Sequence, residues 1–171
     1  MIYLNQLQPE NVTGFYQWIL DYETTKYSLS RFQKLKTKQQ IDDWYQETIN
    51  NTKNVNFGIY LTENNQCIGY AGFSNLSTLN RSAEYFIFIG DKNSWGKGIG
   101  TLTTQKVVAH GFEVLKLNRI MLTVSEPNIG GLKAYLKAGF KHEGILREAC
   151  FREGAFHNKI VMSMLHAEYK K

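Results

Sequence analysis

The sequence predicts an α/β protein of the α+β kind, with one mixed β-sheet and interspersed helices in a single domain over residues 1–171. Three observations support this fold class. The length of 171 residues suits one domain with a sizeable core. Hydrophobic residues repeat with a period of two in some segments and with the helical period in others. Polar or glycine-rich turns join these segments, and the predicted element order is βααβββαβαββ.

A short strand and two amphipathic helices are predicted in the first fifty residues. Residues 2–4 form the strand, and Pro9 stands where a helix can begin. Across residues 12–20, hydrophobic side chains recur every three or four positions, as they do on one face of a helix. Thr37 is the predicted N-cap of the second helix, which ends at residues 50–51.

Strands dominate the middle of the chain. Residues 55–61 alternate between apolar and other side chains, and residues 67–73 resume after a polar turn at residues 63–66, which predicts a hairpin. Residues 82–89 are apolar on both faces towards their end, so we expect this strand in the centre of the sheet.

The last part of the chain alternates between helices and strands. The predicted elements are, in order, a glycine-rich loop at residues 90–100, a helix at 101–116, a strand at 119–124, a helix from Asn128 to Gly139, and strands near 144–151 and 158–165. Asn128 can cap the start of its helix, and Gly139 can end it. Glu153 and Gly154 are a hairpin-turn signal between the last two strands.

Composition excludes several classes of protein. The chain is 43% hydrophobic and 13% aromatic, which argues against disorder, yet no stretch approaches the roughly 20 apolar residues of a membrane span. The N-terminus lacks a signal-peptide pattern. Two distant cysteines, Cys67 and Cys150, and four scattered histidines indicate neither a disulfide framework nor a metal site. We therefore expect a cytoplasmic protein with reduced thiols and no metal.

The net charge of +5 is unevenly distributed. Residues 51–171 carry fifteen basic and nine acidic side chains, which suits an anionic ligand. This excess is too small and dispersed to indicate nucleic-acid binding. Residues 24–41 contain five basic side chains and no acidic one. They form either a solvated basic loop or a contact surface for an acidic group of a substrate.

The glycine-rich loop carries the most chemical information. A strand runs into Gly96, Gly98 and Gly100, and a helix follows at once. Free N–H groups at a helix start, glycines that permit close approach and the helix dipole together predict a bound phosphate or pyrophosphate. The alternative is a plain strand-to-helix turn. The loop lacks the Gly-Lys-Ser/Thr of a nucleoside-triphosphate site, and it matches a dinucleotide fingerprint poorly.

Three motifs resemble those of the Gcn5-related N-acetyltransferase (GNAT) superfamily. Residues 95–100 resemble its acetyl-CoA pyrophosphate loop, Gln/Arg-x-x-Gly-x-Gly/Ala, with Trp95 in the Gln/Arg place. Residues 128–140 resemble its Asn-x6-Tyr-x4-Phe segment. Residues 141–147 and 152–154 resemble the tail of the branch that acetylates ribosomal-protein N-termini, spermidine and other polyamines, and amino sugars.

The resemblance extends over residues 1–168 and implies a GNAT-like fold. Such a fold has a mostly antiparallel central sheet, a splayed parallel strand pair and about four flanking helices. Pantetheine would bond to the backbone of the strand before the loop, and pyrophosphate would bond to the loop amides. The implied acetyl-CoA-binding residues are Ile87, Phe88, Ile89, Trp95, Gly96, Lys97, Gly98, Ile99, Gly100, Thr101 and Asn128.

The implied reaction moves an acetyl group from a thioester to a primary amine. Because an alkylamine has a pKa near 10.4, only about one molecule in 10³ is neutral at pH 7, and a base is useful. Glu84 alternates with Phe86 and Phe88 along one strand face, and the resemblance places an acid here in related enzymes. Glu84 is therefore a candidate catalytic base. The alternative is a structural carboxylate paired with Arg81 or Arg119.

Tyr135 is the candidate general acid for the leaving thiolate. It occupies the position of the tyrosine that similar enzymes use in this role, and a phenol with a pKa near 10 is neutral at pH 7. The alternative is a core tyrosine, because Leu132 and Leu136 lie on the same helix. No covalent enzyme intermediate is implied, so Cys67 and Cys150 are interpreted as packing residues.

The identity of the acceptor amine is the part of the predicted reaction that the sequence determines least. A polyamine pocket needs carboxylates, and residues 24–41 offer none, so we favour a protein N-terminus or a small anionic amine, such as a nucleotide-linked amino sugar. A polyamine and a non-catalytic CoA-binding regulatory module are the alternatives. The presence of both Glu84 and Tyr135 argues against the module. The expected partners are acetyl-CoA and an amine, not nucleic acid or a membrane, with monomer and homodimer both open.

Overall fold

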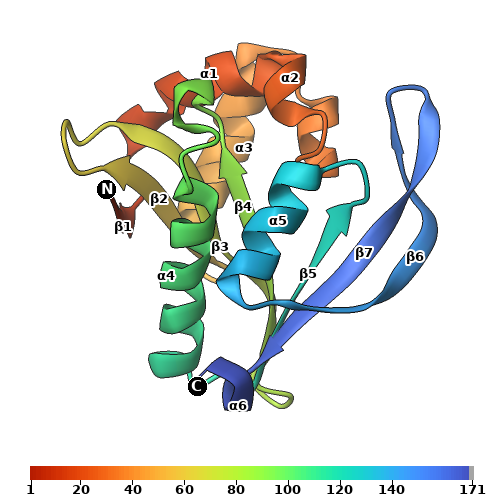
Figure 1. Ribbon diagram of the computed structural model, residues 1–171. Helices are drawn as coiled ribbons and strands as arrows, with labels where there is room; N and C mark the ends of the chain where they lie inside the picture. Colours follow the sequence, from red (N-terminus) through yellow and green to blue (C-terminus); the bar gives the residue numbers. More distant parts are fainter. Residues whose placement is uncertain (170–171) are drawn as a thin grey trace.

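The computed structural model describes residues 1–169, and within them seven strands form one sheet (Figure 1). The strand order is β1-β2-β3-β4-β5-β7-β6, and each neighbouring pair is antiparallel except β4 with β5. The strands are β1 (Ile2–Gln6), β2 (Val55–Leu61), β3 (Cys67–Ser77), β4 (Ser82–Ile89), β5 (Arg119–Ser125), β6 (Lys141–Arg152) and β7 (Ala155–Leu165). The helices are α1 (Val12–Leu20), α2 (Tyr22–Thr25), α3 (Lys38–Asn50), α4 (Ile99–Glu113), α5 (Ile129–Ala138) and α6 (His166–Tyr169).

The predicted fold class and the central position of β4 are confirmed. The predicted N-caps of α3 and α5 and the predicted end of α5 are confirmed as well. The Thr37 side chain accepts the N–H of Gln40 at the start of α3, and the Asn128 side chain accepts the N–H of Gly131 at the start of α5. Gly139, with φ +104°, ends α5. These local signals succeed because each satisfies a backbone group that the helix itself leaves free.

Some boundaries differ from the prediction. Helix α4 begins at Ile99, two residues early, because Gly98 in the left-handed conformation already serves as its N-cap. Strand β3 continues to Ser77, while β6 and β7 begin at Lys141 and Ala155, three residues before the predicted starts. Helices α2 and α6 were not predicted, since four residues are too few to show a hydrophobic period.

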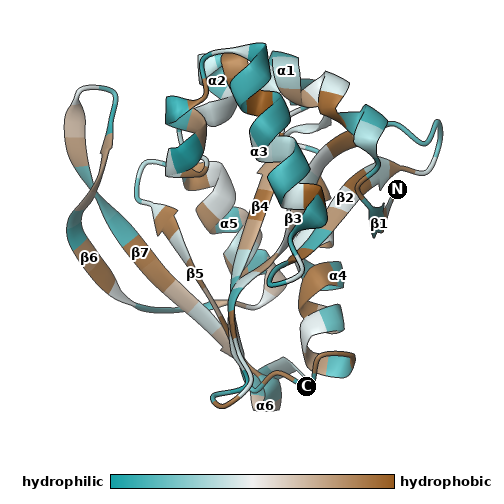
Figure 2. Ribbon diagram, turned by 180° about the vertical axis from the view of Figure 1, so that it is seen from behind, coloured by the Kyte–Doolittle hydropathy of each residue, from teal (hydrophilic) through white to brown (hydrophobic). Residues whose placement is uncertain are grey.

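Hydrophobic side chains pack against both faces of the sheet. One cluster joins Val107 and Phe112 of α4 to the sheet, and α5 packs at its edge. The other joins Phe15 of α1 and Trp44 of α3 to Phe88 of β4. Figure 2 shows the hydrophobic colouring along the central strands and hydrophilic residues on the outer side of α3. Helices therefore cover both faces of β4, as its apolar sequence predicts.

Strands β4 and β5 separate after a short stretch of pairing. Residues 82–84 of β4 pair with residues 119–121 of β5. Beyond these residues the two strands continue to Ile89 and Ser125 but no longer pair with each other. The outer halves of these two strands thus face each other across a gap. This is the splayed parallel pair that the resemblance implies, and it positions the candidate site.

The hairpin of β6 and β7 extends away from the body of the sheet (Figure 1). Its turn is at Glu153 and Gly154, which both have positive φ, as the predicted hairpin turn requires. No helix in the described part of the chain is long and apolar enough to cross a membrane.

Candidate active site

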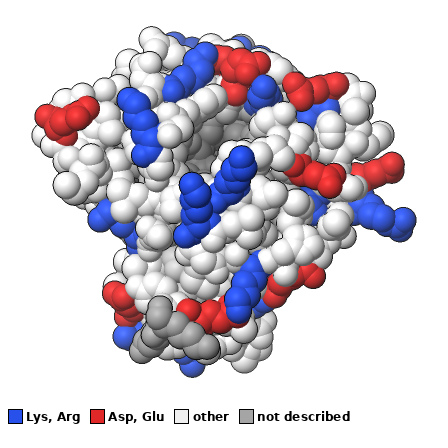
Figure 3. Space-filling model, viewed as in Figure 1, with Lys and Arg blue, Asp and Glu red and all other residues white. Residues whose placement is uncertain are grey.

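A cavity of about 970 Å³ opens where β4 and β5 separate. Its walls come from β4, the glycine-rich loop, the starts of α4 and α5, the segment from α2 to α3, and the hairpin of β6 and β7. Figure 3 shows a recess in this face with several basic side chains around it. The fold brings together in this cavity every predicted site residue except Lys97.

The glycine-rich loop forms an open cradle at the start of α4. Gly96 and Gly98 have φ of +72° and +76°, which glycine adopts without strain. A Cβ atom built on either residue would meet no protein atom within 4 Å, so the space above the loop is free for a ligand. The N–H groups from Gly98 to Thr101 belong to the first turn of α4 and lack intrahelical acceptors. This geometry suits a phosphate group.

Two residues of the loop are placed differently from the prediction. The N–H of Trp95 already donates to the carbonyl of Lys92 at 3.1 Å, so it is not one of the free amides. Lys97 lines a separate cavity of about 340 Å³ together with Asp91 and so does not face the main one. The main cavity instead receives cations from α5, because Lys133 and Lys137 both line it.

Along the edge of β4 that faces the gap, every second residue directs its backbone N–H and C=O groups into the cavity. The N–H of Gly90 donates to β3 at 2.9 Å. Because backbone groups alternate in direction along a strand, Phe88 also bonds towards β3, whereas Ile87 and Ile89 face the gap. The Ile89 carbonyl accepts a bond from the Trp95 indole at 2.9 Å. Of the three predicted β4 residues, Ile87 and Ile89 therefore present backbone groups to the cavity, and Phe88 does not.

Helix α5 contributes Asn128 and Tyr135 to the cavity. Asn128 accepts the Gly131 N–H at 3.0 Å through its side-chain oxygen, which leaves the side-chain NH₂ free for a ligand. The Tyr135 ring lies against Tyr85 and Phe140, with centroids 6.2 and 6.3 Å away. Burial raises the pKa of Tyr135 to about 12, so its hydroxyl stays protonated at neutral pH.

Glu84 lies on β4 at the last pair before β4 and β5 separate. Its carboxylate accepts a hydrogen bond from the Asn75 side chain at 2.8 Å. The structure does not pair it with either arginine considered from the sequence, since Arg119 binds Glu143 and Arg81 donates to the Lys116 carbonyl.

Asn75 was not predicted as a site residue. It lies at an irregularity in β3, where three residues span the distance that two span on β4, and its φ is +51°. Such a bulge redirects a side chain, here towards Glu84. No signal in the sequence indicated this contact, because Asn75 lies beyond the predicted end of the strand at residue 73 and beside another polar residue, Ser74.

Glu84 and Tyr135 reach the cavity from opposite faces of the sheet. Side chains alternate along β4, so Glu84 shares the face of Phe88, which packs with α1 and α3. Tyr135 packs with the cluster on the other face. The gap between β4 and β5 connects the two faces, which allows a base and an acid to act on either side of one reacting group.

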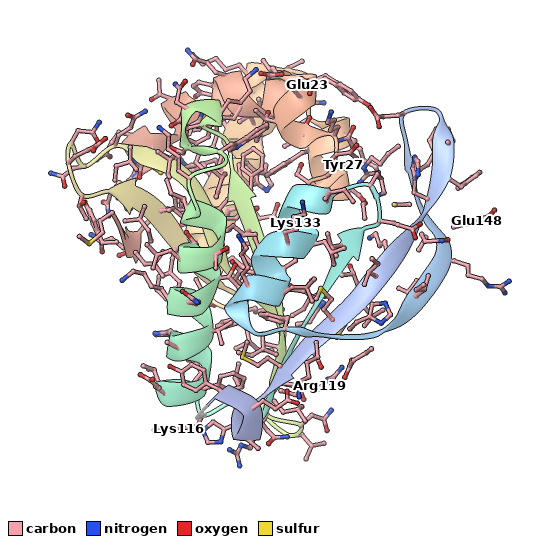
Figure 4. All side chains as sticks on the ribbon, viewed as in Figure 1. Glu23, Tyr27, Lys116, Arg119, Lys133 and Glu148 are labelled. Carbon is pink, nitrogen blue, oxygen red and sulfur yellow. The ribbon has the colours of Figure 1, made fainter. Side chains whose placement is uncertain are left out.

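The segment from α2 to α3 is less basic than its sequence suggested. Lys26 pairs with Glu23 at 3.0 Å, and Arg31 pairs with Glu47 at 2.5 Å. The remaining three lysines of residues 24–41 do not line the cavity. Figure 4 shows Glu23 on the α2 side and Lys133 on α5 below it. Two of its five basic side chains, Lys26 and Arg31, thus line the cavity, and each has a carboxylate partner.

Comparison with known proteins agrees with this geometry. Residues 2–141 match the family model described as acetyltransferase (GNAT) domain. The spermidine N(1)-acetyltransferase of Escherichia coli K12 is 30% identical over 134 residues, covering 76% of this chain and 68% of that protein. An uncharacterized N-acetyltransferase of Bacillus licheniformis, p20, is 28% identical over 97% of this chain and 93% of its own length.

Solved structures show the same fold. A crystal structure of spermidine N-acetyltransferase from Vibrio cholerae in complex with CoA and spermine superposes with a TM-score of 0.87. It covers 99% of this chain and 98% of its own, at 21% sequence identity. The family match and the splayed strand pair confirm the resemblance seen in the sequence: the chain belongs to the GNAT family of acetyltransferases and is an N-acetyltransferase.

Proposed function

We propose that this protein is a cytoplasmic enzyme with one N-acetyltransferase domain over residues 1–171, which moves the acetyl group of acetyl-CoA to a primary amine. One observation supports this most strongly: β4 and β5 separate beside a glycine-rich helix start, and Glu84 and Tyr135 reach that gap from its two sides. The amine nitrogen attacks the thioester carbonyl carbon, the carbon–sulfur bond breaks, and an amide and a thiol result.

The glycine-rich end holds the acyl carrier. The free amides from Gly98 to Thr101 donate to its pyrophosphate, and Lys133 and Lys137 add positive charge on the α5 side. Backbone groups of Ile87 and Ile89 bond to pantetheine in the gap. These contacts place the thioester beside Tyr135 rather than in bulk water.

Two side chains move the protons. Glu84 accepts the proton that the ammonium form of the acceptor must lose, directly or through water, and Asn75 fixes the orientation of its carboxylate. Tyr135, whose hydroxyl is neutral because burial raises its pKa to about 12, donates a hydrogen bond and then a proton to the departing sulfur.

For the acceptor we keep the class favoured from the sequence, a protein N-terminus or a small anionic amine. A second candidate, a polyamine, gains support from three carboxylates that line the cavity, on Glu23, Glu47 and Glu84. The similarity to spermidine N-acetyltransferases of Escherichia coli and Vibrio cholerae points the same way. Two of these carboxylates already bind Lys26 and Arg31, so fewer negative charges are free for a polyamine.

An amine panel tests the proposal. The purified protein and acetyl-CoA are mixed with a peptide N-terminus, a nucleotide amino sugar, an amino acid and spermidine, and thiol release is followed. Mass spectrometry then identifies the acetylated product. We expect thiol release that depends on an amine. Binding of acetyl-CoA without turnover on any acceptor would instead support a non-catalytic module.

A further inference from the structure

We propose that Arg152 determines acceptor specificity by binding a carboxylate at the far end of the amine substrate. This inference rests on the proposed function and deepens it. Arg152 is the last residue of β6, it lines the cavity, and only 8% of its surface is exposed. It belongs to the wall opposite the glycine-rich loop and was not among the predicted site residues.

The guanidinium of Arg152 has only uncharged partners. Its Nη1 donates to the carbonyl of Phe151 at 2.8 Å. Its Nη2 donates to the Ser28 carbonyl at 3.3 Å and to the Ser30 hydroxyl at 3.1 Å. Its Nε is buried and has no acceptor in the described part of the protein. A buried guanidinium with an unsatisfied N–H is costly unless a negative group compensates it.

The nearby carboxylates do not supply that compensation. Glu23 and Glu47 form ion pairs with Lys26 and Arg31, and Glu84 binds Asn75. Glu153, the next residue in the chain, accepts a hydrogen bond from Tyr27 at 3.3 Å. The charge of Arg152 is therefore available to a ligand in the cavity.

A second cation strengthens the positive potential of this wall. Lys159 of β7 also lines the cavity, and no carboxylate of the described residues forms an ion pair with it. Two cations on the hairpin thus face a cavity that also holds the candidate base Glu84. An acceptor with an amine at one end and a carboxylate at the other matches this arrangement, with its amine at Glu84 and its carboxylate at Arg152.

Arg152 also fastens the hairpin to residues 28–30, so a purely structural role must be separated from binding. Three acceptors with the same five-carbon chain make that separation: 5-aminopentanoate, 1-aminopentane and 1,5-diaminopentane. They carry the same reacting amine and differ in a carboxylate, a methyl group or an ammonium at the far end. If Arg152 has only a structural role, its replacement lowers kcat/KM equally for all three acceptors. If it binds the carboxylate, its replacement lowers kcat/KM selectively for 5-aminopentanoate.

The experiment compares kcat/KM for the three acceptors in the wild type, Arg152→Gln and Arg152→Lys. We expect the wild type to prefer 5-aminopentanoate by about 10-fold or more, the usual size of a charged hydrogen bond. Arg152→Gln loses this preference, because kcat/KM falls more for 5-aminopentanoate than for 1-aminopentane, and Arg152→Lys keeps part of the preference. Arg147→Gln is the matched control, since Arg147 is exposed on the same strand and does not line the cavity.

Calorimetry with 5-aminopentanoate in the presence of CoA gives a readout independent of turnover. We expect heat of binding with the wild type and none with Arg152→Gln, whose affinity for acetyl-CoA remains normal. No preference in the wild type, no heat, or an equal loss for all three acceptors would overturn the role of Arg152. Acetylation of 1-aminopentane or the diamine would in that case still support the proposed function, so the two failures are distinguishable.

Discussion

The two ends of the cavity are built in different ways. The glycine-rich end consists mainly of backbone groups from one continuous segment, residues 87–101. The acceptor end consists of side chains from segments far apart in the chain, among them Glu23, Glu84 and Arg152. A backbone site binds any ligand with the right phosphate geometry, whereas a side-chain site selects by charge. In the proposed enzyme, recognition of the common acyl carrier and choice of the acceptor are thus physically separate.

The largest expected effect tests the backbone end. Gly98→Val places a branched side chain where the phosphate approaches and removes close contact with charge-assisted donors, so we expect acetyl-CoA affinity to fall by about 10²-fold. Calorimetry measures this affinity. Gly154→Val is the matched control, because Gly154 has the same φ of +76° and equally open surroundings but lies in the hairpin turn.

Both variants should lose stability to a similar degree, since valine is strained at positive φ by about 1–2 kcal/mol. Only Gly98→Val should lose acetyl-CoA binding. Normal acetyl-CoA affinity in Gly98→Val would mean that the pyrophosphate binds elsewhere.

Removal of the Tyr135 hydroxyl tests the chemistry between the two ends. Tyr135→Phe should lower kcat by about 10²-fold or more, with acetyl-CoA affinity retained, because only proton donation to the sulfur is lost. In the wild type the raised pKa of Tyr135, about 12, means that its protonated form persists well above pH 8. Loss of this hydroxyl should therefore matter equally at pH 7 and pH 9. Tyr3→Phe, at a half-buried tyrosine of β1 that does not line the cavity, is the control; equal kcat in both variants would contradict the acid role.

The base is tested through the pH dependence of the acceptor reaction. Glu84→Gln should lower kcat/KM by about 10- to 10²-fold at pH 7, where the acceptor amine is protonated. The deficit should shrink as the pH rises towards 10, because the neutral fraction of the amine grows and needs no base. Glu148→Gln is the control, since Glu148 points outwards from the hairpin (Figure 4). A deficit that stays constant with pH would assign Glu84 a structural role.

The smallest expected effect concerns Trp95. Its indole N–H occupies the Ile89 carbonyl, a backbone acceptor in the gap. Trp95→Phe frees this carbonyl for pantetheine, so acetyl-CoA should bind about 3- to 5-fold more tightly, the value of one neutral hydrogen bond. Calorimetry measures this change. Weaker binding would show that the indole itself supports the ligand.

The contrast between the two ends also explains what the sequence could predict. The glycine-rich loop, the caps at Thr37 and Asn128 and the period of each strand are local signals, so the fold followed from them and a cofactor end could be proposed. Even there, the sequence could not show that the backbone N–H of Trp95 is already bonded or that Lys97 lines a separate cavity, because φ and hydrogen bonding within the loop decide both.

The acceptor end could not be predicted in the same way. Two of the five basic side chains of residues 24–41, Lys26 and Arg31, pair with Glu23 and Glu47, which lie outside that segment. Asn75 meets Glu84 only because of an irregularity in β3, and Arg152 joins the cavity from 124 residues beyond Ser28. Such contacts depend on tertiary packing, which no local period or motif encodes.

The hydrogen bonds between Arg152 and residues 28–30 have a consequence for synthesis of the chain. The cradle for the acyl carrier lies within residues 87–101 and α5, whereas the acceptor wall needs contacts between the two ends of the sequence. During translation the contacts of Arg152 with residues 28–30 cannot form before β6 is complete, because they join the two ends of one domain. The wall that is proposed to discriminate among amines is therefore one of the last parts of the structure to assemble.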